Sequence, residues 1–302
     1  MLEEDLQFHR VAVLLIILLG LTIYTNSISS SFHFDDQGNI VGNLNLRDIR
    51  KIPLLFHRDR DPKDNPGIPC SRGLAAGTFT LNYYLGGLEV EGYHWVNLSM
   101  HLFNGILVYF FIGSLLLIKR ESGSPLSGRN YAGPFGGDVS MGSFLPLFTA
   151  LFFVANPVQT HGVTYISQRW GEMATLFYLL SLILFIKAVS GERLRVYPYL
   201  GSLFSLLCGL WSKEEVYTAP VMFLLYYLAF VAEDWRRPSL SRGLRLLLPY
   251  IALSGLSFYL GVMAWSWTFE VYWTWGRWEY LLTQASVIVE YIKLLVLPLP
   301  GW

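Results

Sequence analysis

Long apolar stretches separated by short polar segments recur along the whole chain. A helix needs roughly 20 mostly apolar residues to cross about 30 Å of hydrocarbon, and the pattern predicts about eight such helices. The predicted spans are residues 9–27, 94–118, 143–158, 164–188, 197–212, 216–232, 246–266 and 281–298. The third, fifth and sixth are short or interrupted by proline near one end. Such breaks are tolerated where the backbone faces protein or water.

Composition supports this interpretation. The chain has 302 residues, of which 53% are hydrophobic and only 15% are charged, whereas soluble domains carry about a quarter charged residues. The 22 basic residues equal the 22 acidic ones, so no net field favours nucleic acid. Cys70 and Cys208 are too few for a disulfide framework. A soluble enzyme, a disordered protein and a nucleic-acid binder are excluded, and we expect an all-α polytopic membrane protein.

Basic residues in the short loops predict how the chain is oriented. They follow the second, fourth and sixth spans, and short loops rich in lysine and arginine stay in the cytoplasm. These residues are Lys119, Arg120, Arg129, Lys187, Arg193, Arg195, Arg236, Arg237, Arg242 and Arg245. The N-terminus is then cytoplasmic by parity. The opposite face receives Asp35-Asp36, the segment 156–169 and the segment 212–215.

The chain is expected to form one transmembrane domain, residues 1–302, with two notable loops. Residues 28–93 form a long first extracytoplasmic loop, in which Leu74–Leu88 is apolar but too short to span. It is predicted to be a helix in the membrane interface. Residues 119–142 are rich in glycine, serine and proline, which is typical of a flexible cytoplasmic linker.

Asp35-Asp36 is the first candidate for chemistry. Adjacent carboxylates repel each other, so one often has a raised pKa unless a cation or a donor is near. Such a carboxylate can act as a general base toward a hydroxyl group. The alternative is a solvated turn that ends at Gly38, and the residues alone leave both readings open.

Arg169 and Lys213 are the second candidates, because ionisable groups near membrane depth are costly and often functional. Arginine binds phosphate through a bidentate fork, and lysine does so as a point charge. The alternatives are snorkelling for Arg169 and an ion pair with Glu214 or Glu215 for Lys213.

His94 and His101 lie seven residues apart on one face of the second span. No third ligand follows from the spacing, so no metal site is predicted. Helix packing is favoured for His101, whereas His94 remains open.

Several motifs together resemble one family. They cover nearly the whole chain in order: Phe34-Asp35-Asp36, Arg72–Phe79, Leu81–Leu88, Gly92–Leu98 with His101 and Asn104, Asn156–Thr160, Tyr165–Arg169, Ser212–Glu214, Leu282–Gln284 and Leu295–Pro298. The chain resembles the transmembrane and tetratricopeptide-repeat O-mannosyltransferases and their bacterial relatives, within the GT-C glycosyltransferases. It departs from them at Asn156-Pro157, where the family has His-Pro, and at Arg72-Gly73, where it has Arg-Pro.

The resemblance implies a GT-C-like helical bundle that transfers a sugar, with inversion, from a polyprenyl-phosphate-linked donor to a hydroxyl acceptor on the extracytoplasmic face. Asp35 would then be the base, and Asp36 would position the acceptor or a cation. Arg169 and Lys213 would neutralise the leaving phosphate. Glu214 would orient Lys213 or bind sugar hydroxyls. Substrate positioning is further expected of His94, Gln168 and Arg72. GT-C families differ in metal use; a divalent cation is possible as a cofactor, and no metal is assigned.

The expected partners are the lipid-linked donor, membrane lipids and a protein or glycan acceptor, with no nucleic acid. Relatives continue into further spans and helical repeats that are absent after Trp302. A membrane-protein partner could supply these elements, and the alternative function is a non-catalytic scaffold subunit of a membrane complex. A bacterial inner membrane is the preferred location, with the endoplasmic reticulum membrane expected for a eukaryotic protein.

Overall fold

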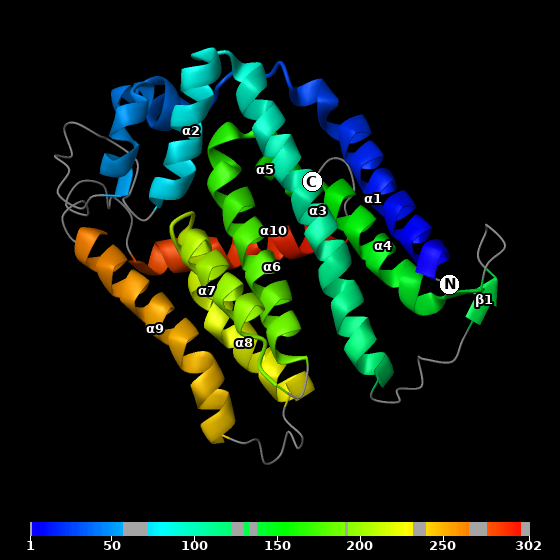
Figure 1. Cartoon of the computed structure of the whole chain (residues 1–302). Helices are drawn as coiled ribbons and strands as arrows, with labels where there is room; N and C mark the ends of the chain where they lie inside the picture. Colours follow the sequence, from blue (N-terminus) through cyan, green and yellow to red (C-terminus); the bar gives the residue numbers. More distant parts are fainter. Residues whose placement is uncertain are drawn as a thin grey trace.

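The computed structural model describes residues 2–56, 72–121, 130–132, 138–190, 193–231, 240–265 and 277–296. Long helices run side by side in a bundle (Figure 1). They are α1 (Leu2–Tyr24), α3 (Val90–Glu121), α4 (Met141–Ala155), α6 (Arg169–Val189), α7 (Val196–Leu210) and α9 (Leu240–Trp265), with the short helix α8 (Ala219–Tyr226) among them.

Shorter elements gather at the end of the bundle that is uppermost in Figure 1, here called the upper end. They include two α-helices, α2 (Gly73–Gly86) and α5 (Thr160–Thr164). The others are one-turn or two-turn helices: η1 (Thr25–Ser27), η2 (Gln37–Val41), η3 (Leu44–Arg47), η4 (Ile49–Phe56), η7 (Pro157–Gln159), η8 (Ile166–Gln168) and η9 (Glu214–Thr218). A further turn, η10 (Tyr227–Val231), continues α8.

Within the described residues, five helical segments are long and apolar enough to cross a membrane. They are Gln7–Ser27, Val90–Leu116, Ile166–Val189, Glu214–Val231 and Gly243–Gly261. Two shorter apolar helices, Phe144–Ala155 and Val196–Leu210, coincide with the predicted third and fifth spans. The expected fold class, an all-α polytopic membrane protein, is confirmed.

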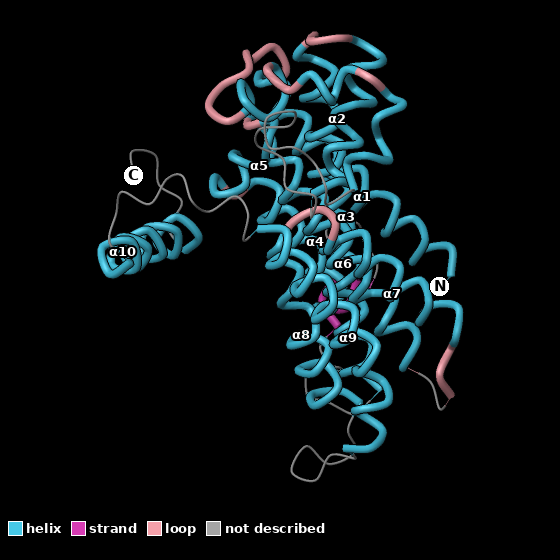
Figure 2. The backbone as a smooth tube through the Cα atoms, turned by 90° about the vertical axis from the view of Figure 1, so that its left-hand side faces the viewer, coloured by secondary structure: helices cyan, strands magenta, loops and turns pink. Residues whose placement is uncertain are grey.

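The eighth predicted span, 281–298, falls largely on α10 (Arg277–Val296), which is not among the membrane-spanning candidates of the described residues. Polar residues recur along this helix at a spacing that places them on one stripe. The stripe consists of Glu279, Thr283, Ser286, Glu290 and Lys293. Figure 2 shows α10 to one side of the bundle, with most side chains exposed. The stripe explains why α10 is less apolar than the bundle helices.

The two loop predictions have different outcomes. Helix α2 matches the helix expected at Leu74–Leu88 and ends at Gly87, whose φ of +61° glycine adopts readily. The linker expected at 119–142 begins inside α3 and contains two short antiparallel strands. These strands are β1 (Asn130–Ala132) and β2 (Asp138–Ser140), with Tyr131 opposite Val139. Residues 122–129 and 133–137 lie outside the described residues.

Helices α3 and α6 lie at the centre of the bundle: α3 packs against α4 and α6, and α6 packs against α7. Small polar residues join α6 and α7. The hydroxyls of Ser181 and Ser202 each donate to the other residue's carbonyl at 2.7 Å, and both side chains are buried. Small residues let membrane helices approach closely, and hydroxyl pairs of this kind add modest stability. The central helices therefore form a rigid support for the upper end.

Gly105 marks the close approach of α1, α3 and α4. A Cβ at this position would lie 2.5 Å from Val154 Cγ2 and 3.2 Å from Ile16 Cγ2. We expect Gly105→Ala to lower the free energy of unfolding by about 1–3 kcal/mol through overpacking. Denaturant titration of the protein in detergent measures this loss.

Two comparisons test the cause. Combined with Val154→Ala, the Gly105→Ala substitution should cost less than the sum of the two single variants. At Gly255 on α9 no atom lies within 4 Å of a Cβ, so Gly255→Ala should leave stability unchanged or slightly raised. Strict additivity of Gly105→Ala and Val154→Ala would show that their contact is not the cause.

Candidate functional site at the upper end of the bundle

The adjacent carboxylates of Asp35 and Asp36 have opposite surroundings. Asp36 is fully buried and accepts three hydrogen bonds: Ser167 N–H at 2.8 Å, the Ser167 hydroxyl at 2.5 Å and His33 N–H at 3.2 Å. Asp35 is exposed. In this conformation Asp36 therefore fastens the turn to the start of α6 and does not face an acceptor or a cation, which differs from the role expected of it. Asp35 is the carboxylate that is open to a substrate.

Tyr165 is the closest described neighbour of Asp35. Its hydroxyl oxygen accepts a hydrogen bond from Asp35 N–H at 3.1 Å. Its ring stacks on His33, with 5.6 Å between ring centroids, and meets the edge of His161 at 5.2 Å. Burial, and then a hydrogen bond to the Asp35 side chain, raise the pKa of Tyr165 to about 12. The phenol therefore stays protonated at neutral pH and can donate to the carboxylate.

His161 lies beside this cluster and remains uncharged at neutral pH. Burial lowers its pKa below the usual 6.5, and the positive charge of Lys213 and the neighbouring His33 lower it further. A lowered pKa leaves the imidazole neutral above that value. The positive charge beside His161 is therefore that of Lys213.

Arg169 begins α6 and has no exposed surface. Its guanidinium lies 4.5 Å from the ring centroid of Phe79, and its N–H groups point to acceptors on α2 and α3. The acceptors are Asn82 Oδ1 at 2.5 Å, Asn97 Oδ1 at 2.8 Å, the Tyr93 carbonyl at 2.9 Å and Thr78 Oγ1 at 3.3 Å. This arrangement differs from the phosphate contact expected of Arg169, because a guanidinium engaged on this many sides presents no open fork.

Lys213 and Gln168 flank Gly171 on the exposed side of α6. A Cβ at Gly171 would lie 3.5 Å from Lys213 Nζ and 3.6 Å from Gln168 Oε1. Lys213 Nζ also pairs with Glu215 Oε1 at 2.6 Å, and about a fifth of the lysine side chain is exposed. The absence of a side chain at Gly171 thus leaves room beside one cation and one amide.

Arg72 and Glu214 pair with each other. Arg72 Nη2 and Nε donate to the two Glu214 carboxylate oxygens at 2.9 and 3.3 Å, a bidentate geometry. The guanidinium also lies 4.4 Å from the ring centroid of Trp170. Glu214 thus joins η9 to the start of α2, and its expected roles toward Lys213 or sugar hydroxyls stay predictions.

A groove of about 220 Å³ runs between α6 and η9, next to the Lys213–Glu215 pair. Its α6 wall continues the helix face that contains Gly171. The lining residues are Ala174, Thr175, Tyr178 and Leu179 of α6 with Glu215, Val216 and Thr218 of η9. Tyr178 and Thr218 share a hydrogen bond of 3.3 Å between their hydroxyls. The groove is therefore apolar along most of its length and charged at the end near Lys213.

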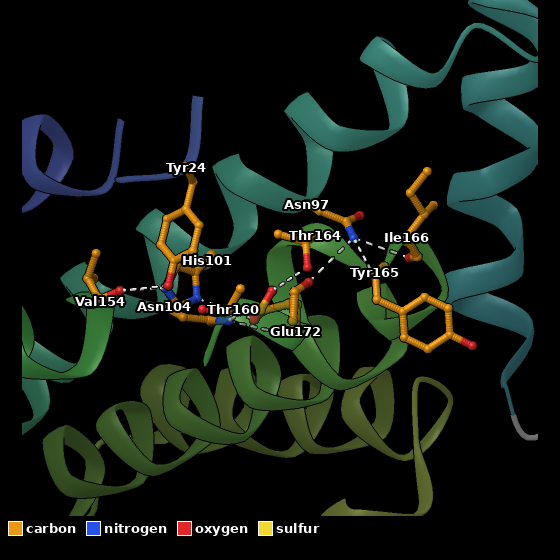
Figure 3. A network of polar contacts seen from close by, with 11 residues as sticks. Tyr24, Asn97, His101, Asn104, Val154, Thr160, Thr164, Tyr165, Ile166 and Glu172 are labelled. Carbon is orange, nitrogen blue, oxygen red and sulfur yellow. Dashed lines mark hydrogen bonds and ion pairs between the residues drawn. The ribbon is translucent and has the colours of Figure 1, made fainter. Parts of the chain in front are cut away.

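A buried polar network supports the site from below (Figure 3). Glu172 Oε2 accepts from Asn104 Nδ2 at 2.7 Å, and Glu172 Oε1 lies 3.3 Å from His101 Nδ1. Asn97 Nδ2 donates to the carbonyl of Ile166 at 3.2 Å. His101 packs between helices as the sequence favoured, whereas Glu172 was not singled out. The sequence feature that could have identified Glu172 was a carboxylate inside the predicted span 164–188.

His94 is fully buried, and its Nε2 lies 2.9 Å from the Ser30 carbonyl. It thus fastens the segment after α1 to α3 and has no surface open to substrate, unlike the positioning role expected of it. Among the described residues, no group of three or more histidine, cysteine, aspartate or glutamate side chains could hold a metal.

Comparison with known proteins confirms the resemblance stated above. The chain is 30% identical to protein O-mannosyl-transferase TMTC4 of Mus musculus over 182 residues, 59% of this chain and 23% of that protein. It is 25% identical to protein O-mannosyl-transferase TMTC3 of Mus musculus over 240 residues, 78% of this chain and 23% of the relative. It is 29% identical to protein O-mannosyl-transferase TMTC2 of Homo sapiens over 215 residues, 69% of this chain and 23% of the relative.

The matched segments thus span less than a quarter of the length of these curated relatives. No protein-family model matches the chain, and no solved structure matches it. The named relatives are animal proteins, so the comparisons do not support the bacterial inner membrane expected from the sequence.

Proposed function

We propose that the protein is an integral-membrane glycosyltransferase of the GT-C type, which moves a sugar from a polyprenyl-phosphate-linked donor to a hydroxyl acceptor. The names of its relatives support a mannosyl donor and a protein acceptor. One observation carries the proposal: the exposed Asp35 lies at the same end of the bundle as Lys213, whose partner Glu215 lines a groove of about 220 Å³. A base, a phosphate-binding cation and a groove beside it are the parts that such a transfer needs.

The reaction is a single displacement. The acceptor hydroxyl oxygen attacks the anomeric carbon, and its proton passes to the Asp35 carboxylate. The bond between the anomeric carbon and the phosphate oxygen breaks, and polyprenyl phosphate leaves with the bonding electrons. Attack opposite the leaving group inverts the anomeric centre.

Lys213 is the proposed phosphate-binding residue, and Gln168 lies beside it across Gly171. On binding, the ammonium group exchanges its contact with Glu215 for the donor phosphate, where negative charge develops in the transition state. The first isoprene units of the donor occupy the groove between α6 and η9. The contacts of Asp36, Arg72, Glu214, His94 and Arg169 hold together the segments that form the site.

The proposed location is a eukaryotic internal membrane such as the endoplasmic reticulum, with the upper end facing away from the cytosol. This orientation follows from the basic residues in the short loops, because lysine and arginine are retained on the cytoplasmic side. A scaffold function in a membrane complex is the alternative.

Gly171 gives the direct test of the donor site. We expect Gly171→Leu to raise KM for a polyprenyl-phosphate-linked mannose at least tenfold, because its side chain fills the space between Lys213 and Gln168. Gly171→Ala is the matched control, since its Cβ meets both groups at ordinary contact distances. Transfer to a serine- and threonine-containing peptide is measured with the purified protein in lipid nanodiscs. Equal KM values for the two variants would contradict the proposed donor site.

A further inference from the structure

The turn that carries Asp35 is strained. Phe34 has a φ of +50°, the left-handed region that bulky residues rarely adopt. Its side chain is 82% exposed, so no burial of the ring compensates for this conformation. Strain of this kind persists only where surrounding contacts impose it.

Two contacts from one short segment impose the turn. Tyr165 accepts the Asp35 N–H, and Ser167 donates twice to the Asp36 carboxylate. The Ser167 contacts are enclosed and fix the turn as a whole. The Tyr165 contact acts at the residue whose carboxylate is exposed, so it determines how Asp35 is presented.

Tyr165 is itself held rigidly. Its carbonyl accepts from Asn97 Nδ2 at 3.5 Å, and Asn97 in turn accepts from the buried Arg169 at 2.8 Å. Its side chain is packed against His33 and His161, and only 7% of the residue is exposed. Because these contacts hold Tyr165 in place, its hydroxyl can determine the orientation of the exposed Asp35.

We infer that Tyr165 is the positioning residue for the base Asp35, an inference that rests on the proposed function. The single phenol oxygen accepts the Asp35 amide N–H, and its proton is available to the Asp35 carboxylate. The first contact fixes the backbone after Phe34. The second orients the exposed carboxylate group of Asp35.

The test is Tyr165→Phe, which removes only the hydroxyl. We expect kcat to fall about tenfold or more while KM for the donor changes less than about twofold. This split between kcat and KM is a readout that a merely structural role of the hydroxyl would not produce.

Tyr199→Phe is the matched control. Tyr199 lies near the start of α7 and donates to the Leu246 carbonyl of α9 at 2.7 Å, and its variant should keep both kcat and KM. Should Tyr165→Phe fold poorly, 3-fluorotyrosine at position 165 retains the ring and the hydroxyl. Fluorine makes the phenol oxygen a weaker acceptor for the Asp35 N–H, so kcat should fall while KM for the donor changes less than about twofold.

The two ideas fail separately. If Asp35→Asn transfers sugar at the wild-type rate, the proposed function fails. If Asp35→Asn is inactive but neither Tyr165 variant lowers kcat, the proposed function stands and the inference about Tyr165 is overturned.

Discussion

Asp35→Asn is expected to lower sugar transfer by about 10²–10⁴-fold, the contribution typical of a general base. The amide has nearly the shape of the carboxylate but cannot take the acceptor proton. Because Asp35 is exposed, the substitution leaves no buried charge and should preserve folding. Transfer from polyprenyl-phosphate-linked mannose to the peptide is measured beside the unfolding midpoint in the same nanodiscs.

Asp48→Asn is the matched control, because Asp48 is a surface carboxylate of the same loop region that pairs with the exposed Arg50. It should retain wild-type transfer. A wild type that transfers no sugar, yet co-purifies with an active partner whose rate is unaffected by Asp35→Asn, would favour the scaffold function. If Asp35→Asn itself transfers sugar at the wild-type rate, Asp35 is not the general base.

Arg169→Leu is expected to have the largest effect on stability. The guanidinium donates to acceptors on α2 and α3, and its removal leaves Asn82, Asn97 and the Tyr93 carbonyl without these donors. Each buried group left unsatisfied costs about 1–3 kcal/mol, so we expect a loss of more than about 3 kcal/mol. The yield of monodisperse protein and the unfolding midpoint measure it. Arg169→Lys should retain only part of the stability that Arg169→Leu loses, since an ammonium group cannot reproduce the planar guanidinium fork.

Arg50→Leu provides the comparison. The Arg50 side chain is 87% exposed, and surface substitutions usually change stability by less than about 0.5 kcal/mol. The Arg169→Leu variant could instead fold with normal stability and lose only its affinity for the donor. That result would support the phosphate contact first expected of Arg169. Loss of folding in that variant supports a structural role for the guanidinium.

Local patterns were sufficient to predict most helices. Apolar stretches of suitable length predicted the bundle, and Leu74–Leu88 predicted α2. The pattern failed at α10, because a helix with a polar stripe on one side still has many apolar residues in any window. At 119–142 the flexible linker stays a prediction, because residues 122–129 and 133–137 lie outside the described residues.

The sequence by itself determined that the chain is a membrane protein, and that Asp35, Arg169 and Lys213 belong to one end of its bundle. These features depend on residue type and on the order of the spans. Only the tertiary structure decided which of these charges is open: Asp35 is exposed, Asp36 and Arg169 are enclosed, and Glu214 pairs with Arg72. The physical reason is that the exposure of a side chain depends on which neighbours enclose it. Here those neighbours, such as Ser167 for Asp36 and Asn97 for Arg169, are distant in the chain and are brought near only by the packing of α2, α3 and α6.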